Sequence, residues 1–206
     1  MYYGIDVDFK EFTVCQIDEN KNVKILSHFF KEGLYWFIDH HHPDILTVNI
    51  AINQEPSKTK YALDIIHKIQ KEFEYIIADE NIIKKGERKI IIKTATDLFF
   101  KKIIRKDILP ITTREGLEQR LYNLKKTGIK LPKGFLSKDK NKLRRELNAV
   151  ISAFTSLSLN KKDYEVVESF EEKLFIPKYR FVPSTNRIKR KVKEKNGKRQ
   201  SAPTDS

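Results

Sequence analysis

The sequence has few of the features by which a class of protein is usually recognised. It has a single cysteine, Cys15, so no internal disulfide can form, which fits a reducing cytoplasm. It has only seven glycines, and none lies in a phosphate-binding loop motif. No apolar run approaches the roughly 18 residues of a membrane span. The N-terminus enters a strand-like segment at once, without a basic segment and an apolar signal core. We therefore expect a cytoplasmic protein with no membrane partner.

Length and composition predict one folded domain with an extension. The chain has 206 residues, and single domains mostly span roughly 100 to 200. Hydrophobic residues make up 39% and charged residues 33%, which indicates a core with a strongly solvated surface. We expect the domain over residues 1–183 and a tail over residues 184–206.

The net charge of +13 is concentrated in that tail. The run RIKRKVKEKNGKR, from Arg187 to Arg199, has eight basic residues and the single acid Glu194, a net charge of +7. Apolar residues are nearly absent there, so we expect the tail to be disordered in isolation. Such arms bind phosphate backbones by releasing counterions, without reading sequence; a solubilising tail is the alternative. The candidate nucleic-acid-binding residues are Arg187, Lys189, Arg190, Lys191, Lys193, Lys195, Lys198 and Arg199.

Hydrophobic periodicity predicts the order of the structural elements. YYGIDVD, FTVCQI and VKILSHF alternate as strands joined by short polar links, which predicts an antiparallel three-strand meander. The later expected elements are, in order, a helix over 31–42, a buried strand over 44–52, an amphipathic helix over about 61–73, a short strand over 74–78 with a charged turn over 79–89, a strand over 89–95, helices over 96–106 and 114–128, a long helix over 138–159, and two short extended pieces before Pro177. The aromatic residues in these periodic segments are expected in the core, namely Tyr2, Tyr3, Trp36, Phe99, Phe100 and Phe154.

The long helix carries two kinds of side chain along its length. Its wide apolar stripe predicts that it lies against the sheet. Beside this stripe runs a polar line, at steps of four, four and three, made of Arg144, Asn148, Ser152 and Thr155. Three antiparallel strands, alternating helices and strands, and a final long helix form the chain order of a ribonuclease-H-like fold. We therefore expect an α/β protein with a mixed five-stranded sheet and flanking helices.

Asp6 lies near the middle of the first strand, between Ile5 and Val7. A carboxylate in a buried strand is costly unless it is paired, hydrogen-bonded or bound to a metal. In one interpretation Asp6 or Asp8 ends the strand and starts the turn. In the other, Asp6 is the first carboxylate of a cation site. In a ribonuclease-H-like fold, acids from the first strand, the fourth strand and the last helix can converge on one or two divalent cations.

Several segments resemble known nucleases. YYGIDVDFKEFTVCQIDENKNVKIL resembles the opening strands of ribonuclease-H-like nucleases and transposases, where a Gly-Ile-Asp run carries the first metal ligand. KIIIKTATDLFFKKIIRKDILP, REGLEQRLYNLKKTG and RRELNAVISAFTSLSLNKKDYEVVESFEEKLFIPK resemble the family called domain of unknown function 429, a group of predicted nucleases. The resemblance covers residues 1 to about 178. It implies a ribonuclease-H-like scaffold and a reaction that depends on Mg²⁺ or Mn²⁺.

The chain departs from that family at the positions that would carry the metal. The first acid falls on Asp6, but the next falls on Asn49 and the helix acid falls on Asn148. Arg145 stands where the family has histidine, and the acid near the middle strand falls near Lys93. Hard cations bind mainly through carboxylate charge, so we expect Mg²⁺ or Mn²⁺ to bind weakly. The resemblance thus implies a relic site made of Asp6, Asn49 and Asn148.

Three classes of function remain open. The first is a nucleic-acid-binding protein on a nuclease scaffold, with weak or no hydrolysis. The second is an active metal-dependent nuclease with Asp6 and Glu146 as catalytic residues and Asp6 and Asp8 as metal ligands. Glu146 matches the family but lies two residues from Asn148, so it points to another side of the helix. The third is a protein-interaction or nucleotide-handling domain of the same fold.

Overall fold

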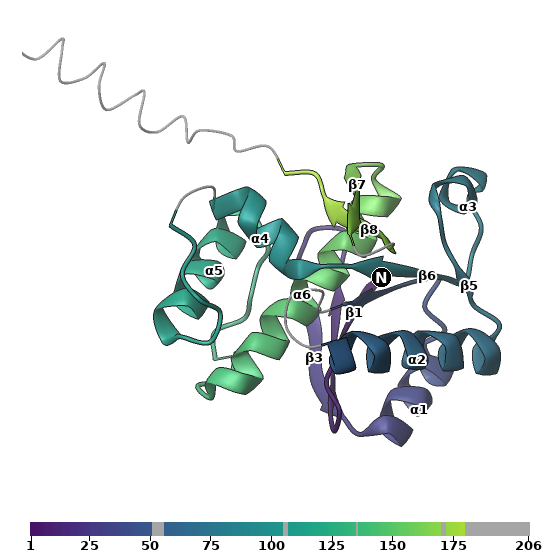
Figure 1. The fold of residues 1–206 in the computed structure, drawn as a ribbon, viewed down its shortest axis with the longest axis horizontal. Coiled ribbons are helices and arrows are strands. Elements are labelled where there is room, and N and C mark those ends of the chain that lie inside the picture. Colours follow the sequence, from purple (N-terminus) through teal and green to yellow (C-terminus); the bar gives the residue numbers. More distant parts are fainter. Residues whose placement is uncertain (51–55, 105–106, 135, 170–171, 180–206) are drawn as a thin grey trace, which may run out of the picture.

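The computed structural model describes residues 1–50, 56–104, 107–134, 136–169 and 172–179. The predicted tail over residues 184–206, with its eight basic residues, lies outside this part of the chain. The elements are β1 (Tyr2–Val7), β2 (Phe12–Ile17), β3 (Val23–Phe29), α1 (Lys31–His41), β4 (Ile45–Asn49), α2 (Pro56–Phe73), β5 (Ile76–Ile77), α3 (Glu80–Lys85), β6 (Ile90–Thr94), α4 (Thr96–Ile104), α5 (Arg114–Lys126), α6 (Lys140–Asn160), β7 (Tyr164–Ser169) and β8 (Glu172–Pro177). Figure 1 shows their arrangement.

The main sheet has the strand order β3-β2-β1-β4-β6-β5. The pairs β1–β2 and β2–β3 are antiparallel, which confirms the predicted meander. The pairs β1–β4, β4–β6 and β5–β6 are parallel. This mixed sheet with flanking helices confirms the predicted ribonuclease-H-like fold. The prediction of five strands was wrong, because the two residues of β5 pair with β6 and add a sixth.

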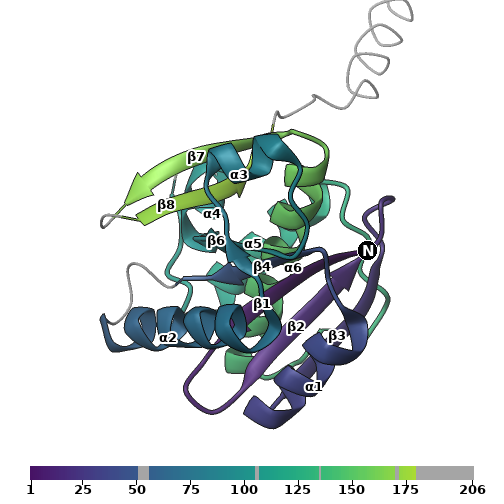
Figure 2. The same cartoon turned by 90° about the vertical axis from the view of Figure 1, so that its right-hand side faces the viewer.

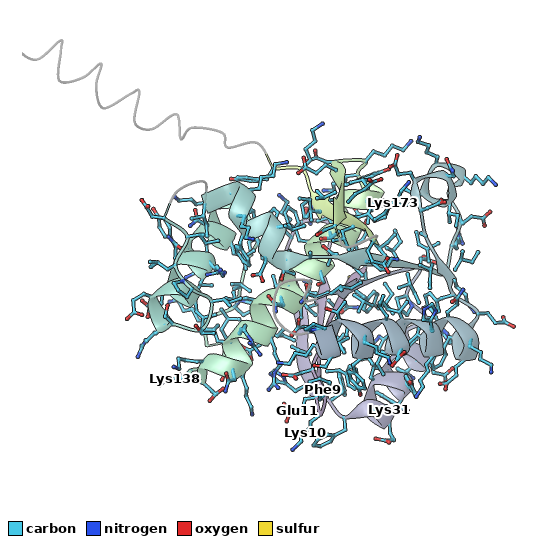
Figure 3. The ribbon with its side chains drawn as sticks, viewed as in Figure 1. Phe9, Lys10, Glu11, Lys31, Lys138 and Lys173 are labelled. Atoms are coloured by element: carbon cyan, nitrogen blue, oxygen red, sulfur yellow. The ribbon has the colours of Figure 1, made fainter. Side chains whose placement is uncertain are left out.

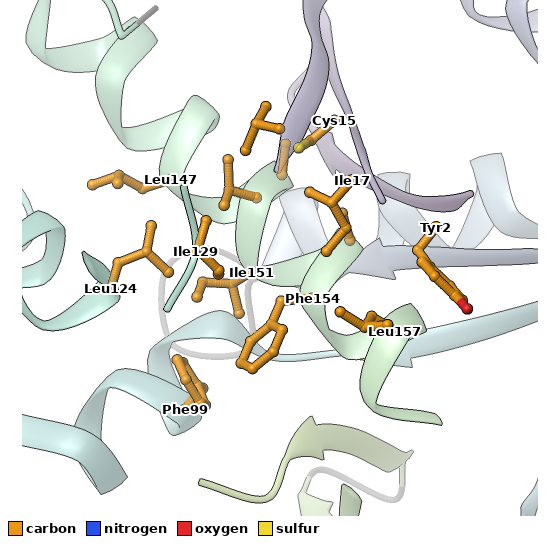
Figure 4. Close-up of a cluster of buried hydrophobic side chains, with 14 of the residues drawn as sticks. Tyr2, Cys15, Ile17, Phe99, Leu124, Ile129, Leu147, Ile151, Phe154 and Leu157 are labelled. Atoms are coloured by element: carbon orange, nitrogen blue, oxygen red, sulfur yellow. The ribbon is translucent and has the colours of Figure 1, made fainter. Parts of the chain in front are cut away.

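Helices cover both faces of this sheet (Figures 1 and 2). Successive residues of a strand point to opposite faces, so Tyr2 and Tyr3 of β1 enter different cores. Tyr2 belongs to the cluster formed with α4, α5 and α6, whereas Tyr3 packs with α1 and α2. Figure 4 shows the first cluster, in which Phe154 and Leu157 of α6 lie between sheet residues and Phe99 of α4. The helix α6 is therefore the central element of its layer.

The strand β1 packs closely on α6 at Gly4. Every residue of this helix from Glu146 to Leu159 is buried, so the helix is enclosed on all sides. A Cβ atom at Gly4 would lie 2.0 Å from the backbone nitrogen of Ala153, so only glycine allows β1 and α6 to pack at this distance. None of the described helices combines the length and apolar character that would let it cross a membrane.

The two predicted extended pieces near the C-terminus pair as a separate antiparallel sheet. In this hairpin β7 pairs with β8 from Tyr164–Pro177 to Ser169–Glu172. Phe175 of β8 packs with Ile90 and Ile92 of β6, so the hairpin lies against the main sheet. An ion pair between Glu172 and Lys93 joins the same two elements.

The charged segment from 79 to 89 forms a helix where the sequence predicts a turn. The Asp79 carboxylate accepts the backbone N–H groups of Asn81 and Ile82, both at 2.9 Å, and so caps α3. Gly86 ends the helix in the left-handed region, with φ of +73°. The turn prediction was wrong because these two end signals lie seven residues apart, which leaves room for a helix of about one and a half turns.

Trp36 is exposed, although its periodic segment predicts a core position. Its side chain is 61% exposed and stacks on His40, with ring centroids 4.9 Å apart. The buried stripe of α1 consists of Leu34, Phe37 and Ile38. Since successive helical residues point about 100° apart, Trp36 falls outside that stripe.

Candidate functional site

Asp6, Asn49 and Asn148 come together at one end of the sheet. Asp6 of β1 and Asn49 of β4 are paired in the parallel register, so their side chains lie side by side on the face covered by α6. Asn49 Nδ2 donates a hydrogen bond to Asp6 Oδ1 at 2.7 Å. Asn148 Nδ2, from α6, donates to the same oxygen at 3.1 Å. One carboxylate oxygen therefore receives both amides.

Thr96, the first residue of α4, closes the cluster. Its backbone N–H donates to Asn49 Oδ1 at 3.1 Å, and its Oγ1 hydroxyl donates to Asn148 Oδ1 at 2.9 Å. A backbone N–H can only donate, so Asn49 must present its oxygen to Thr96 and its nitrogen to Asp6. Both amides of the cluster are thus turned with their N–H groups toward the carboxylate.

Sequence reasoning missed Thr96 as a member of this cluster. Its position was the available signal, because it comes two residues after Thr94, the last residue of β6. Thr94 pairs with Asn49 across β4 and β6. Residues that follow adjacent parallel strands meet at the same edge of a sheet, which is where Thr96 reaches Asn49.

The Asp6 carboxyl group is protonated more readily than an ordinary aspartate. Burial raises its pKa to about 7, because a charged carboxylate is poorly solvated there. Hydrogen bonds from Asn49 and Asn148 and the charge of Arg144 oppose this rise, while the charge of Asp8 adds to it. Near neutral pH the cluster therefore carries well below one full negative charge.

This donor set does not match what a pair of hard cations requires. Mg²⁺ takes oxygen ligands, and its affinity comes mainly from carboxylates. Around Asp6 the amides of Asn49 and Asn148 present N–H groups, while their oxygens are bonded to Thr96. Within the described residues, no group of three or more histidine, cysteine, aspartate or glutamate side chains is placed to hold a metal. Weak binding of Mg²⁺ or Mn²⁺ stays a prediction.

Asp8 follows the last residue of β1, and its partners differ from those of Asp6. Its carboxylate oxygens lie 3.6 Å from Arg145, 3.9 Å from Arg144 and 4.0 Å from Lys58. Arg145 also binds Glu11, at 2.6 Å. Asp8 therefore belongs to a network of ion pairs between the β1–β2 turn, α2 and the first turns of α6.

Glu146 contacts β3 and the segment before α6. Its Oε1 lies 3.1 Å from His28 Nε2, and its Oε2 accepts the backbone N–H of Ser137 at 2.7 Å. The other ring nitrogen of His28 lies 3.0 Å from Thr13 Oγ1. Both carboxylate oxygens of Glu146 are therefore engaged, and a nuclease that used Glu146 with Asp6 and Asp8 would need it to leave both partners.

Lys93 also lies outside the cluster. Its neighbour Thr94 faces α6, with Oγ1 3.4 Å from Thr155 Oγ1. Successive strand residues point to opposite faces, so Lys93 turns away and pairs with Glu172 of the hairpin.

Basic side chains lie on the β1–β2 turn, in the first turn of α2 and around the start of α6, and three of them contact Asp8 next to the cluster. Figure 3 shows Phe9, Lys10 and Glu11 at the tip of the β1–β2 turn, and Lys138 just before α6. Arg144 and Arg145 link that turn to α6 through Asp8 and Glu11. We call these cations the basic rim, which consists of Lys10, Lys58, Lys138, Lys140, Lys142, Arg144 and Arg145.

The strand order, with α6 packed across the sheet, defines the class of this protein as a ribonuclease-H-like fold. No family model matches the chain, and no curated protein matches it. The resemblance to the domain of unknown function 429 family thus stays a prediction. Among solved structures, the crystal structure of the yeast mitochondrial Holliday junction resolvase Ydc2 is similar. It shares 12% identity with a TM-score of 0.43, covering 78% of this chain and 81% of that chain.

Proposed function

We propose that the chain binds nucleic acid on a ribonuclease-H-like scaffold and does not hydrolyse it with divalent cations. The observation that carries this proposal is the donor set around Asp6. Two-cation hydrolysis of a phosphodiester needs charged oxygens that hold two ions about 4 Å apart. Here Asn49 and Asn148 offer N–H groups to a carboxyl whose pKa is raised to about 7.

The charge distribution supports nucleic acid as the partner. The chain has a net charge of +13, which attracts polyanions. The basic rim places cations at the end of the sheet that would hold a substrate backbone. Lys138, Lys140 and Lys142 of this rim are exposed, whereas Arg144 and Arg145 are partly neutralised by Asp8 and Glu11. We propose that the rim and the basic tail contact phosphates without reading sequence.

Binding and cleavage assays on the full chain test this proposal. Labelled single strands, duplexes and hybrids of DNA and RNA would be titrated at about 50 and about 200 mM salt, with and without Mg²⁺ or Mn²⁺. We expect binding that weakens steeply with salt, and no cleavage. Deletion of residues 184–206 should lower both the affinity and the salt slope, by about 0.7 to 0.9 in slope for each phosphate that the shortened chain no longer neutralises.

Other outcomes would separate the remaining classes. Cleavage that Asp6→Ala abolishes would show an active nuclease and overturn the proposal. No binding to any nucleic acid would favour a protein-interaction domain. The same assays test the rim with a triple variant, Lys138→Ala with Lys140→Ala and Lys142→Ala, alongside the tail deletion. If neither change alters affinity or salt slope, the contact surface lies elsewhere.

A further inference from the structure

An exposed aromatic ring stands at the turn between β1 and β2. Phe9 is 45% exposed, and its backbone N–H donates to Asp8 Oδ1 at 2.8 Å. Asp8 N–H also donates to the Glu11 carbonyl at 3.1 Å, which closes the turn. These bonds fix the backbone under the ring. The ring is therefore presented by an ordered turn.

Other aromatic rings support Phe9 from the protein side. Its centroid lies 5.4 Å from that of Tyr61 on α2, with the rings tilted by 41°. Tyr61 in turn lies 6.4 Å from Phe12, which is 1% exposed. This row of tilted rings thus runs from the core to the surface and ends at Phe9. A turn of polar residues needs no such ring for folding, because the apolar area that stays in water contributes nothing to the core.

One cation lies near the same ring, and others lie at the neighbouring residue Asp8. Lys58 Nζ lies 6.0 Å from the Phe9 centroid, and Lys10 is the next residue along the turn. Arg144 and Arg145 approach from α6 through Asp8. An aromatic face bordered by cations suits a nucleotide, whose base stacks on the ring while its phosphate pairs with the charges.

We infer that Phe9 is a stacking platform for an unpaired base, which makes single-stranded nucleic acid the preferred substrate class. This inference rests on the proposed function. A base inside a duplex already has both faces stacked on its neighbours, whereas an unpaired base has a free face. Stacking is tolerant of sequence, because every base offers a π face. The platform therefore selects strand structure and leaves base identity unread.

The test uses the full chain and strands that carry aminopurine, a fluorescent base whose emission changes when it stacks. We expect the parent to quench this emission and to bind single strands more tightly than duplexes. Phe9→Ala should lose the quenching and weaken single-strand binding about 5- to 100-fold, with less than about a twofold change for duplexes. Phe9→Tyr should behave as the parent, whereas Phe9→Leu should resemble Phe9→Ala.

Tyr122→Ala is the matched control. Tyr122 on α5 is 61% exposed and also has a lysine over its ring, with Lys126 Nζ 4.1 Å from the centroid. We expect this variant to bind single strands as the parent does. If Phe9→Ala binds normally, or if Phe9→Leu binds as well as Phe9→Tyr, stacking on Phe9 is refuted while nucleic-acid binding stands. If the parent binds no nucleic acid at all, the proposed function itself fails.

Discussion

Asn148 donates its side-chain amide to Asp6 Oδ1 at 3.1 Å, although 142 residues separate the two in the sequence. The bond joins the central helix α6 to the central strand β1. Because Asn49 donates to the same oxygen, Asp6 acts in the fold as a hydrogen-bond acceptor. The buried charge of Asp6 destabilises the folded state, whereas its oxygen stabilises that state by linking β1 to β4 and α6. The first prediction separates these contributions.

Asp6→Asn should remove a pH dependence of stability. In the folded protein the pKa of Asp6 is raised to about 7, whereas in the unfolded chain it lies near the ordinary value of 3.8. Between these values the folded state holds a proton that the unfolded state has lost, so stability falls as pH rises and levels off above the folded pKa. We expect the unfolding free energy of Asp6→Asn, relative to the parent, to rise by about 4 kcal/mol from about pH 4 to about pH 8.

Urea unfolding of both proteins across that range measures the difference. The asparagine keeps an oxygen for the amides of Asn49 and Asn148, so the variant should fold. Asp6→Ala serves as the control, because it removes both the charge and the acceptor and should be destabilised at every pH. Parallel stability curves for the parent and Asp6→Asn would contradict the burial of a titrating carboxyl group.

The double variant Asn49→Asp with Asn148→Asp should gain affinity for divalent cations. It would place two further carboxylates beside Asp6, which supplies the charge that hard cations need. Without a cation these like charges repel, so the variant should be less stable than the parent. Calorimetric titration with Mg²⁺ and Mn²⁺, and melting with and without Mn²⁺, would measure both effects. The parent should show little response in either assay.

The control for this gain is Asn49→Gln with Asn148→Gln, which lengthens both amides without adding charge. It should bind cations no more tightly than the parent. If the aspartate variant shows no gain in cation affinity and no rise in melting temperature with Mn²⁺, the three positions do not form a relic metal site.

Gly4→Ala should be severely destabilising. The added Cβ would lie 2.0 Å from Ala153 N and 2.5 Å from the Ala149 carbonyl oxygen, and neither backbone atom can move without shifting α6. We expect a loss of about 3 kcal/mol or more in unfolding free energy. Gly86→Ala is the comparison, because its Cβ would meet nothing within 4 Å and only the left-handed φ of +73° opposes it. That change should cost about 1 kcal/mol. Equal losses in denaturant unfolding would argue against the close packing of β1 on α6.

Glu146→Ala should weaken the fold and leave nucleic-acid affinity unchanged. Glu146 accepts the Ser137 N–H and contacts His28, so its removal leaves these partners unsatisfied, at a cost of about 1 to 3 kcal/mol. Glu146→Gln keeps an acceptor for Ser137 and should lose less. Thermal melting ranks the three proteins, and binding assays at matched temperature show whether affinity holds. Loss of a cleavage activity in Glu146→Gln, with the fold intact, would restore Glu146 as a catalytic candidate.

Much of the fold followed from local patterns. Alternating residues predicted β1, β2 and β3, and helical spacing predicted α1, α5 and α6 close to their observed bounds. The end of α2 was also predicted, but this helix begins at Pro56, earlier than the expected start near Tyr61. The errors occurred where a periodic pattern was short, or where a single residue did not follow the pattern of its segment. The helix α3 was missed because its start depends on one capping side chain, that of Asp79. The core prediction for Trp36 was wrong because this residue lies outside the buried stripe of its helix. Two residues of β5 carry too little periodicity to show that they extend the sheet.

Three of the four members of the candidate site were predictable, but their hydrogen bonds were not. The positions of Asp6, Asn49 and Asn148 came from a resemblance to other sequences, and the structure brings these side chains together. Thr96 was missed, because its position just after β6 indicates the edge of the sheet that it reaches but not the amides to which it bonds. The partners of Glu146, which are His28 and Ser137, could not be predicted, because they come from other segments of the chain.

The sequence by itself determined which residues are buried in most elements and where charge accumulates, because both depend on local spacing and composition. Only the tertiary structure decided how the polar side chains of α6 are used. That polar line could have faced water, but it lies against the sheet, where Thr155 meets Thr94 and Asn148 reaches Asp6. The physical reason is that a hydrogen-bond partner is chosen by packing between distant segments, and periodicity along one segment carries no information about its neighbour.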